Sequence, residues 1–187
     1  RPDFEGTSGS VRVGAGNEGN TELDGYLNIT ISDTFAFRLG AAKRDSDGFY
    51  YNATLGRDVG ESEFTVISPS ITWRPSESVE VYYRFDKTDQ EQDANTLLNV
   101  AQSDQVFCFY YGQCSQGLQT PQAGSRYTVL QNDDPPYQTY FDTKTHILDI
   151  SWELNDQYSL EFVYGGFETE EEVYQDWDGT PATLYHT

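Results

Sequence analysis

The chain has 187 residues and a formal net charge of -20, from 31 Asp and Glu against 11 Lys and Arg. This charge repels nucleic acid and anionic membrane surfaces, so we expect no nucleic-acid partner and a preference for cations. Aromatic residues reach 15% of the chain. No stretch approaches the roughly 18–20 consecutive apolar residues of a membrane-spanning helix, so helical spanning is excluded.

The first half of the chain alternates apolar and polar residues in segments divided by turn clusters. Because successive side chains of a strand point to opposite faces, this alternation predicts strands with one apolar face. Two turns are very short, at Ser32-Asp33-Thr34 and Ser76-Glu77-Ser78, whereas residues 49–61 form a polar loop that contains Tyr. Pro75 lacks a backbone donor and is expected to end its strand. The expected strands cover residues 9–16, 21–32, 34–46, 62–74 and 78–89.

The second half repeats the hairpin after a long outer loop that is expected at residues 87–142. Residues 147–164 alternate on both sides of the turn Asn155-Asp156. This pattern predicts strands at 143–154 and 157–170. An acidic tail runs from Glu168 to Asp178. We therefore expect residues 1–187 to form a single all-β segment, an antiparallel up-and-down meander of long hairpins.

The connections alternate between short and long, and aromatic residues lie near the short turns on the apolar side. Barrels of bacterial outer membranes combine short turns at one end, longer loops at the other and aromatic girdles at the membrane interfaces. The strands are therefore expected to belong to an outer-membrane β-barrel. The alternative is a soluble antiparallel sandwich with the same aromatic residues in its core. The candidate membrane-interface aromatics are Phe35, Trp73, Trp152 and Tyr158.

Several segments resemble the start of a TonB-dependent receptor barrel. They are a glycine-rich first strand, a G-x-x-N segment that leads to Ile-Ser-Asp, a following strand that ends in Arg-Asp and then Gly-Phe, and two turns that begin at Trp. In this chain they occupy residues 9–14, 25–28, 31–39, 44–50, 73–78 and 152–157. The resemblance covers nearly all the expected strands and little of the long outer loop.

The resemblance implies an outer-membrane receptor that takes up a scarce ligand, such as a ferric siderophore, cobalamin or a carbohydrate. Its implied partners are outer-membrane lipid, the rest of the barrel and an inner-membrane energy complex that is reached through a missing N-terminal part. Both chain ends are expected to be cuts, with the plug domain and the remaining barrel absent. About seven strands are expected here, against about 22 in plugged transporters.

Two cysteines, Cys108 and Cys114, lie close together in the long outer loop. In an exported chain such a pair indicates a disulfide that closes a small loop. A metal pair and two free thiols are the alternatives, but without a nearby pair of His residues a zinc site is weakly supported.

Aromatic residues surround the cysteines and are candidate ligand-binding residues of the outer mouth. Amphipathic rings bind ligands with little loss of conformational entropy. The alternative is that they pack the loop on itself. The candidates are Phe107, Phe109, Tyr110, Tyr111 and Tyr127, with Tyr137 and Tyr140 in the same group.

Acidic residues at Asp86, Asp89, Glu91, Asp93 and in the tail from Glu168 to Asp178 offer the hard oxygen ligands that Ca²⁺ takes. Their spacing does not match an EF-hand loop, and a solvated acidic face is the simpler interpretation. No other cofactor or metal is expected.

Catalysis is not expected, because the only His residues are His146 and His186 and no nucleophile-elbow, phosphate-loop or zinc-protease motif occurs.

A second hypothesis concerns the chain on its own. An open sheet with unpaired edges and an apolar surface recruits further strands. The fragment is then expected to assemble with copies of itself into an extracellular β-rich filament or tube.

Overall fold

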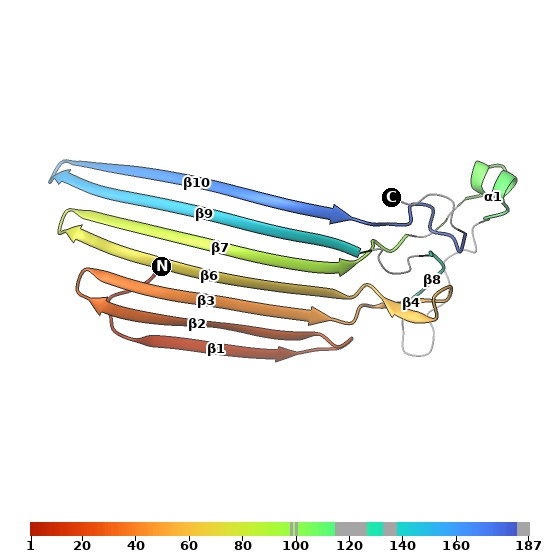
Figure 1. Cartoon of the computed structure of the whole chain (residues 1–187), viewed down its shortest axis with the longest axis horizontal. Coiled ribbons are helices and arrows are strands. Elements are labelled where there is room, and N and C mark those ends of the chain that lie inside the picture. Colours follow the sequence, from red (N-terminus) through yellow and green to blue (C-terminus); the bar gives the residue numbers. More distant parts are fainter. Residues whose placement is uncertain (98, 100, 115–126, 133–137, 183–187) are drawn as a thin grey trace.

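A computed structural model describes residues 1–97, 99, 101–114, 127–132 and 138–182. Seven long strands form one sheet in the order β1-β2-β3-β6-β7-β9-β10, and each strand is antiparallel to its neighbour (Figure 1). This arrangement confirms the predicted all-β antiparallel meander. The strands are β1 (Ser8–Ala15), β2 (Thr21–Ser32), β3 (Phe35–Ser46), β6 (Ser62–Ser76), β7 (Val79–Asp93), β9 (Gln138–Asn155) and β10 (Tyr158–Val173).

Several strands are longer than the alternation predicts. β7 runs to Asp93 and β9 begins at Gln138, so the connection between them covers residues 94–137 instead of 87–142. The prediction that Pro75 ends its strand is wrong, because β6 continues to Ser76. Pro75 lies in a bulge, between the pairs Trp73–Val81 and Ser76–Val79, where a missing backbone donor leaves no ladder hydrogen bond unmade.

The long connections meet at one end of the sheet, which we call the loop end (Figure 1). A second, three-stranded sheet forms there from β4 (Tyr50–Asn52), β5 (Arg57–Val59) and β8 (Tyr127–Val129). The loop predicted at residues 49–61 is therefore a small hairpin, which pairs in parallel with a strand far along the chain. One short helix, α1 (Val106–Tyr111), lies at the tip. None of the helical residues described here forms a helix long and apolar enough to cross a membrane.

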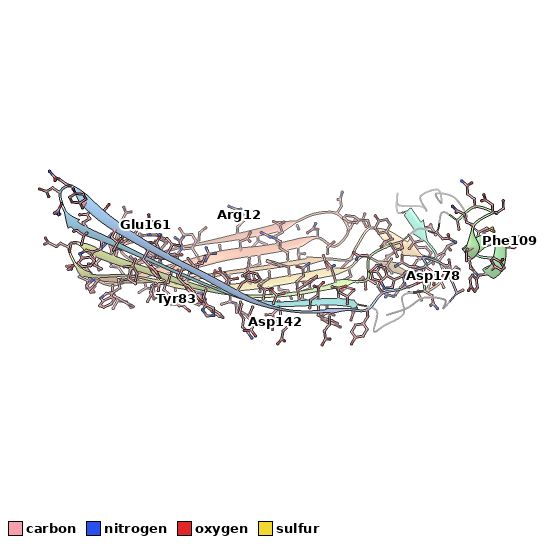
Figure 2. The ribbon with its side chains drawn as sticks, turned by 90° about the horizontal axis from the view of Figure 1, so that it is seen from above. Arg12, Tyr83, Phe109, Asp142, Glu161 and Asp178 are labelled. Atoms are coloured by element: carbon pink, nitrogen blue, oxygen red, sulfur yellow. A yellow bond between two sulfur atoms is a disulfide. The ribbon has the colours of Figure 1, made fainter. Side chains whose placement is uncertain are left out.

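The large sheet has two chemically different faces. Seen along the sheet in Figure 2, Arg12 and Glu161 point to one side, and Tyr83 and Asp142 point to the other. The register places Leu39, Ile71, Tyr83, Leu148 and Tyr164 on the second side. We call this side the apolar face and the side with Arg12 and Glu161 the polar face.

Residues 1–7 cross the polar face instead of extending the sheet. The side chain of Asn28, which is fully buried, donates to the Asp3 carbonyl over 3.2 Å and to the Gly6 carbonyl over 3.1 Å. Thr72 donates to the carbonyl of Pro2 over 3.2 Å. The segment therefore lies over β2, β3 and β6, near the short turns.

Candidate functional site

The apolar face carries a continuous apolar band that begins at the short turns. On β3, β6, β7, β9 and β10, four alternating residues next to the turn are apolar or aromatic, with Pro69 among them. Each stretch spans seven residues, 35–41, 67–73, 79–85, 148–154 and 158–164. At about 3.3–3.4 Å per residue this is roughly 20 Å of strand, close to the roughly 25 Å apolar belt of outer-membrane barrels.

The side chains of the apolar band are exposed to an unusual degree. Trp73 and Trp152 are 47% and 46% exposed, and Phe162 is 52% exposed. Soluble monomers rarely leave such large contiguous apolar patches in water. The four predicted interface aromatics, Phe35, Trp73, Trp152 and Tyr158, all lie on this face beside the short turns.

Toward the loop end, the same face changes from apolar to polar or charged on all five strands. Beyond the apolar stretch, and apart from His146 and Gly166, the first such residues on β3, β6, β7, β9 and β10 are Lys43, Thr65, Lys87, Lys144 and Glu168. We call this region the charged level. A groove of about 360 Å³ opens there, and Glu63, Asp89, Glu91, Tyr140, Glu170 and Glu172 contribute to its lining.

Lys87 bonds to two of the carboxylates that line this groove, Asp89 and Asp142. Its ammonium donates to Asp89 over 2.8 Å and also bonds to Asp142. The hydrogen bond raises the pKa of Lys87 and lowers the pKa of Asp142. Both side chains are exposed, so solvent screens the pair and limits its effect on stability.

The two kinds of basic residue separate between the faces. The strand arginines of the large sheet, Arg12, Arg38, Arg44, Arg74 and Arg84, lie on the polar face, whereas Lys43, Lys87 and Lys144 lie on the opposite side. The guanidinium carbon of Arg38 lies 3.6 Å from the centre of the Tyr26 ring, and the same side chain donates to the Arg1 carbonyl over 3.0 Å.

The polar face also holds the start of the chain through charged contacts. The Arg1 guanidinium forms an ion pair with Asp149, and its Nη1 lies 3.6 Å from Oε1 of Glu80. Its central carbon lies 4.5 Å from the centre of the Tyr82 ring. Arg74 stacks over Phe4 at 4.1 Å. The apolar face receives no such segment within the described chain.

The loop end is packed around polar side chains. Asn52 is fully buried, donates to the Gln131 carbonyl over 2.8 Å, and accepts from the amides of Thr54 and Leu55. Gln131, 1% exposed, accepts from the Leu97 amide over 2.5 Å. These bonds tie the hairpin β4–β5 to the connection between β7 and β9, so the predicted outer loops form one folded unit.

The chain after β10 belongs to the same unit. Asp176 is fully buried and accepts from the amides of Asn132 and Asp178 over 3.0 and 2.9 Å. Desolvation by burial raises the pKa of Asp176. No periodic pattern marks Asn52, Gln131 or Asp176 in the sequence. Asp176 was considered only as part of the acidic tail from Glu168 to Asp178, and the buried, hydrogen-bonded roles of these three residues were not predicted.

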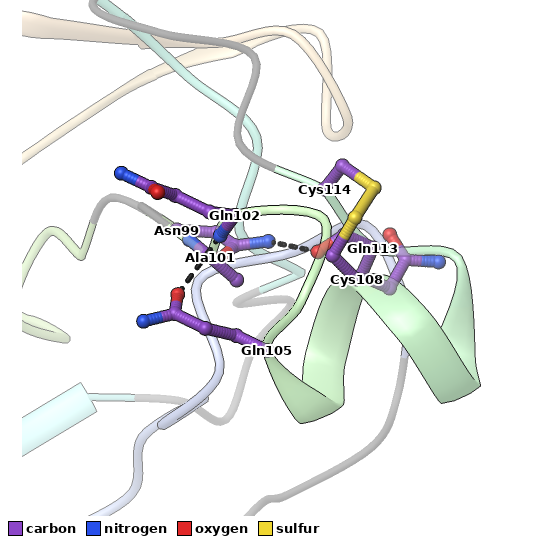
Figure 3. The surroundings of a disulfide bond; sticks show 7 residues. All are labelled: Asn99, Ala101, Gln102, Gln105, Cys108, Gln113 and Cys114. Atoms are coloured by element: carbon purple, nitrogen blue, oxygen red, sulfur yellow. Dashed lines mark hydrogen bonds between the residues drawn. A yellow bond between two sulfur atoms is a disulfide. The ribbon is translucent and has the colours of Figure 1, made fainter.

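The tip helix α1 carries part of the predicted aromatic group, Phe107, Phe109, Tyr110 and Tyr111. The Cys108–Cys114 disulfide is present as predicted and closes the helix onto the residues after it. Gly112, with a positive φ of 68°, ends the helix, and Asn99 donates to the Gln113 carbonyl over 2.7 Å (Figure 3). The bond from the Gln102 amide to the Gln105 side chain, 2.8 Å, fixes the entry to the helix.

Three predicted ligand-binding residues are exposed on α1. Phe109, Tyr110 and Tyr111 are 69%, 75% and 55% exposed. Tyr140 lies elsewhere, in the groove of the charged level. The side chains of Phe107 and Tyr127, and all of Tyr137, lie outside the described residues.

The predicted calcium ligands are spread over several places. Asp86 lies on the polar face and binds Ser68 and Arg84, while Asp93 accepts from the Gly60 amide over 2.9 Å. Across the part of the chain that the structure describes, no group of three or more His, Cys, Asp or Glu side chains is arranged to hold a metal ion. Calcium binding stays a prediction.

His146, the histidine that the structure describes, contacts aromatic side chains of β7. His146 lies on the apolar face, where its Nδ1 is 2.7 Å from the Tyr83 hydroxyl and its ring is 4.9 Å from that of Phe85. His186 lies outside the described residues.

Comparison with protein-family models, with curated proteins and with solved structures finds no match to this chain.

Proposed function

We propose that the chain forms part of the wall of an outer-membrane β-barrel of the TonB-dependent receptor type, which takes up a scarce ligand such as a ferric siderophore. The observation that carries this proposal is the apolar band. Five neighbouring strands are apolar over the seven residues next to the short turn and become polar or charged beyond them. A lipid layer imposes such a common boundary, whereas the core of a sandwich has no reason to end in charge on one side.

The opposite face fits the interior of a barrel. Porin-type and plugged barrels have a polar interior, with side chains that alternate with the lipid-facing ones. Here the interior side would carry the arginines, Asp149 and residues 1–7. A chain segment on this side is what a receptor with a plug inside its barrel requires.

The loop end is the proposed outer mouth. Its long connections contrast with the short turns at the other end, as in outer-membrane barrels. The exposed aromatic residues of α1 are the proposed ligand-contacting group, and the disulfide holds them in place. Oxidising conditions outside the cytoplasm suit such a bond.

The alternative proposal, assembly of the chain with copies of itself, is favoured by one observation. Among the described residues no strand pairs with the outer edge of β1 or of β10. Unpaired edges recruit other strands. In that case the apolar face would be buried between copies, and the product would be a structural filament.

An accessibility experiment in Gram-negative cells that produce the protein tests the receptor proposal. One peptide tag is inserted after Gly112 at the tip, and a second after Glu77 in a short turn. We expect antibody to label the tip tag on intact cells, and the turn tag only after the outer membrane is permeabilised. Equal labelling of both tags on intact cells contradicts the proposed orientation, and recovery of the protein as extracellular filaments supports the alternative.

A growth experiment addresses uptake. Deletion of the gene is expected to slow growth when iron or another scarce nutrient is supplied only as a bulky complex, and not when it is supplied free. Unchanged growth on every complexed nutrient contradicts a receptor role.

A further inference from the structure

The charged level of the apolar face has its positive and negative charges in a regular order. On three strands a lysine lies on the side of the apolar band, and an aspartate lies two residues farther toward the loop end. These pairs are Lys43 and Asp45 on β3, Lys87 and Asp89 on β7, and Lys144 and Asp142 on β9. Two residues of strand cover roughly 6.6–6.8 Å. On each of these strands, positive charge therefore lies between the apolar band and the carboxylates.

A hollow of about 340 Å³ opens in the apolar face beside Lys43. Gly25 and Ala41 are paired neighbours on β2 and β3, and they leave room there because neither has a large side chain. Val11 and Ile67 border the hollow from β1 and β6. Small-molecule sites have volumes of roughly 300–1,000 Å³. The hollow therefore offers an apolar floor of useful size with a cation at its side.

The strands that carry the hollow floor and the lysines lie inside the sheet. β2, β3, β7 and β9 are each paired with a strand on both sides. Additional wall strands at either edge of the sheet would not cover this surface. In the proposed barrel it faces lipid, at the height where the apolar band ends and lipid headgroups begin.

The carboxylates beside the hollow have room for a second cation. The ammonium of Lys43 lies 2.8 Å from Glu63 and 3.4 Å from Asp45, which face each other on β6 and β3. The hydrogen bond to Glu63 raises the pKa of Lys43, so this lysine stays positive. An ionised carboxylate has two oxygens that accept about four hydrogen bonds in total. Asp45 and Glu63 can therefore accept from another donor without losing Lys43.

We propose that the hollow and the charges beside it bind a lipid with a phosphoethanolamine headgroup. An acyl chain lies over Gly25 and Ala41, the phosphate meets Lys43, and the primary amine meets Asp45 and Glu63. The phosphate of such a lipid is next to its acyl chains and the amine is farther out, which is the order of the opposite charges on the strand. This site rests on the proposed function, because it requires the apolar band to lie in a membrane.

A headgroup that is only anionic fits the same surface less well. Its phosphate would meet Lys43 but would also face the carboxylates beyond it, and the neighbouring groove adds Asp89, Glu91 and Glu170. Like charges repel, and the whole chain has a net charge of -20. The amine of phosphoethanolamine replaces this repulsion with ion pairs.

Fluorescence quenching by brominated lipids in vesicles tests the proposal on the whole chain. A Leu39→Trp variant, with Phe in place of Trp73, Trp152 and Trp177, has one reporter on β3 beside Ala41. Phosphatidylcholine vesicles contain the same minor fraction of brominated phosphatidylethanolamine or brominated phosphatidylglycerol. We expect the ethanolamine lipid to be enriched roughly twofold over the glycerol lipid at this reporter, as for one exposed ion pair. A variant that keeps only Trp73, at the other end of the band, is expected to show no preference.

An exchange of charges locates the effect. Lys43→Glu together with Glu63→Lys keeps the ion pair and the net charge but reverses their order from the apolar band. We expect this exchange to abolish the preference at the reporter. The control exchanges the pair on the polar face of the neighbouring strands, Arg44→Glu with Glu22→Arg, and is expected to keep the preference.

The possible failures have different readouts. If fully brominated phosphatidylcholine quenches neither Trp73 nor the reporter, the face does not contact lipid, and the proposed function fails together with the lipid site. If it quenches both while the ethanolamine and glycerol lipids quench the reporter equally, only the lipid site is overturned. Native mass spectrometry of the unmodified chain with equal amounts of the two lipids needs no variant to fold. Retention of the glycerol lipid to the same or a greater extent also overturns the site.

Discussion

The large sheet and the loop end bury opposite kinds of side chain. In the sheet, Trp152 and Phe162 are about half exposed, and few apolar side chains are buried. At the loop end, Asn52 and Asp176 are fully buried and hydrogen-bonded. One region leaves apolar surface outside, and the other takes polar groups inside.

This difference shows where each region obtains its stability. The sheet is held by its backbone ladder and requires something apolar to cover its exposed face, because the hydrophobic effect is proportional to the apolar area removed from water. The loop end contains its own core, in which the buried side chains of Asn52, Gln131 and Asp176 have hydrogen-bond partners that replace water. The buried Thr128 hydroxyl is an exception, because it has no hydrogen-bond partner among the described residues. We therefore expect the sheet to depend on lipid or detergent, and the loop end to depend on specific hydrogen bonds.

The largest expected effect is on the apolar face. Ile150→Lys places a charge near the middle of the apolar band, and we expect it to lower the free energy of unfolding in lipid vesicles by roughly 2–4 kcal/mol. Ser151→Lys, one residue along the same strand, places the charge on the polar face between Glu80 and Glu161. It is expected to have little effect. Equal losses in the two variants, measured by denaturant titration, contradict a lipid-facing band.

The second effect concerns the buried network of the loop end. Asn52→Leu removes the partner of the Gln131 carbonyl and of the Thr54 and Leu55 amides. A buried polar group without a partner costs roughly 1–3 kcal/mol. Hydrogen exchange is expected to accelerate in β4, β5 and β8 and to stay unchanged at the centre of the large sheet. Uniform acceleration in both regions would show that they do not unfold separately.

The third effect is confined to the tip. Reduction of the Cys108–Cys114 disulfide, or Cys114→Ser, is expected to destabilise α1 locally by at most about 2 kcal/mol, because the closed loop is short. The amides of Phe109 and Gly112, which donate to the carbonyls of Gln105 and Cys108 at the two ends of α1, are expected to exchange faster. Unchanged exchange at these amides after reduction contradicts the bracing role of the disulfide.

The smallest effect is a difference in pH dependence between the two regions. Burial raises the pKa of Asp176. At pH values between the ordinary Asp pKa of about 3.9 and this raised pKa, Asp176 therefore binds more protons in the folded loop end than in the unfolded chain. The contribution of Asp176 to the stability of the loop end is therefore present at acidic pH and is lost as pH rises through the folded pKa of Asp176. The bond to Lys87 lowers the pKa of Asp142, so that contribution is present above about 3.9 and is lost as pH falls through the lower folded value.

Hydrogen exchange at several pH values, corrected for the intrinsic exchange rate, measures this difference. Between neutral pH and about pH 4, the free energy of opening at the Asn132 and Asp178 amides is expected to increase. It is expected to stay nearly constant at Thr143, beside Asp142 on β9. A decrease at both places under acid would show that desolvation of Asp176 does not govern the loop end.

The sequence predicts the large sheet well, because its information is local. Alternation fixes which residues share a face, and short turns such as Ser32-Asp33-Thr34 fix the order of the strands. The nearby cysteines predict their own disulfide. By contrast, Asn52 bonds to a residue 79 positions away, and β4 pairs in parallel with β8. Such contacts leave no periodic signal in either segment, and neither the small sheet nor the path of residues 1–7 could be read from the pattern.

Quenching of tryptophan fluorescence by brominated lipids tests the lipid-facing band most directly. Trp73 and Trp152 lie on the apolar face beside the short turns, and Trp177 lies at the loop end. In variants that keep one tryptophan each, with Phe at the other two positions, we expect brominated lipid to quench Trp73 and Trp152 strongly and Trp177 hardly at all. Equal fluorescence of Trp73 and Trp152 in brominated and ordinary lipid would contradict contact between this face and a membrane.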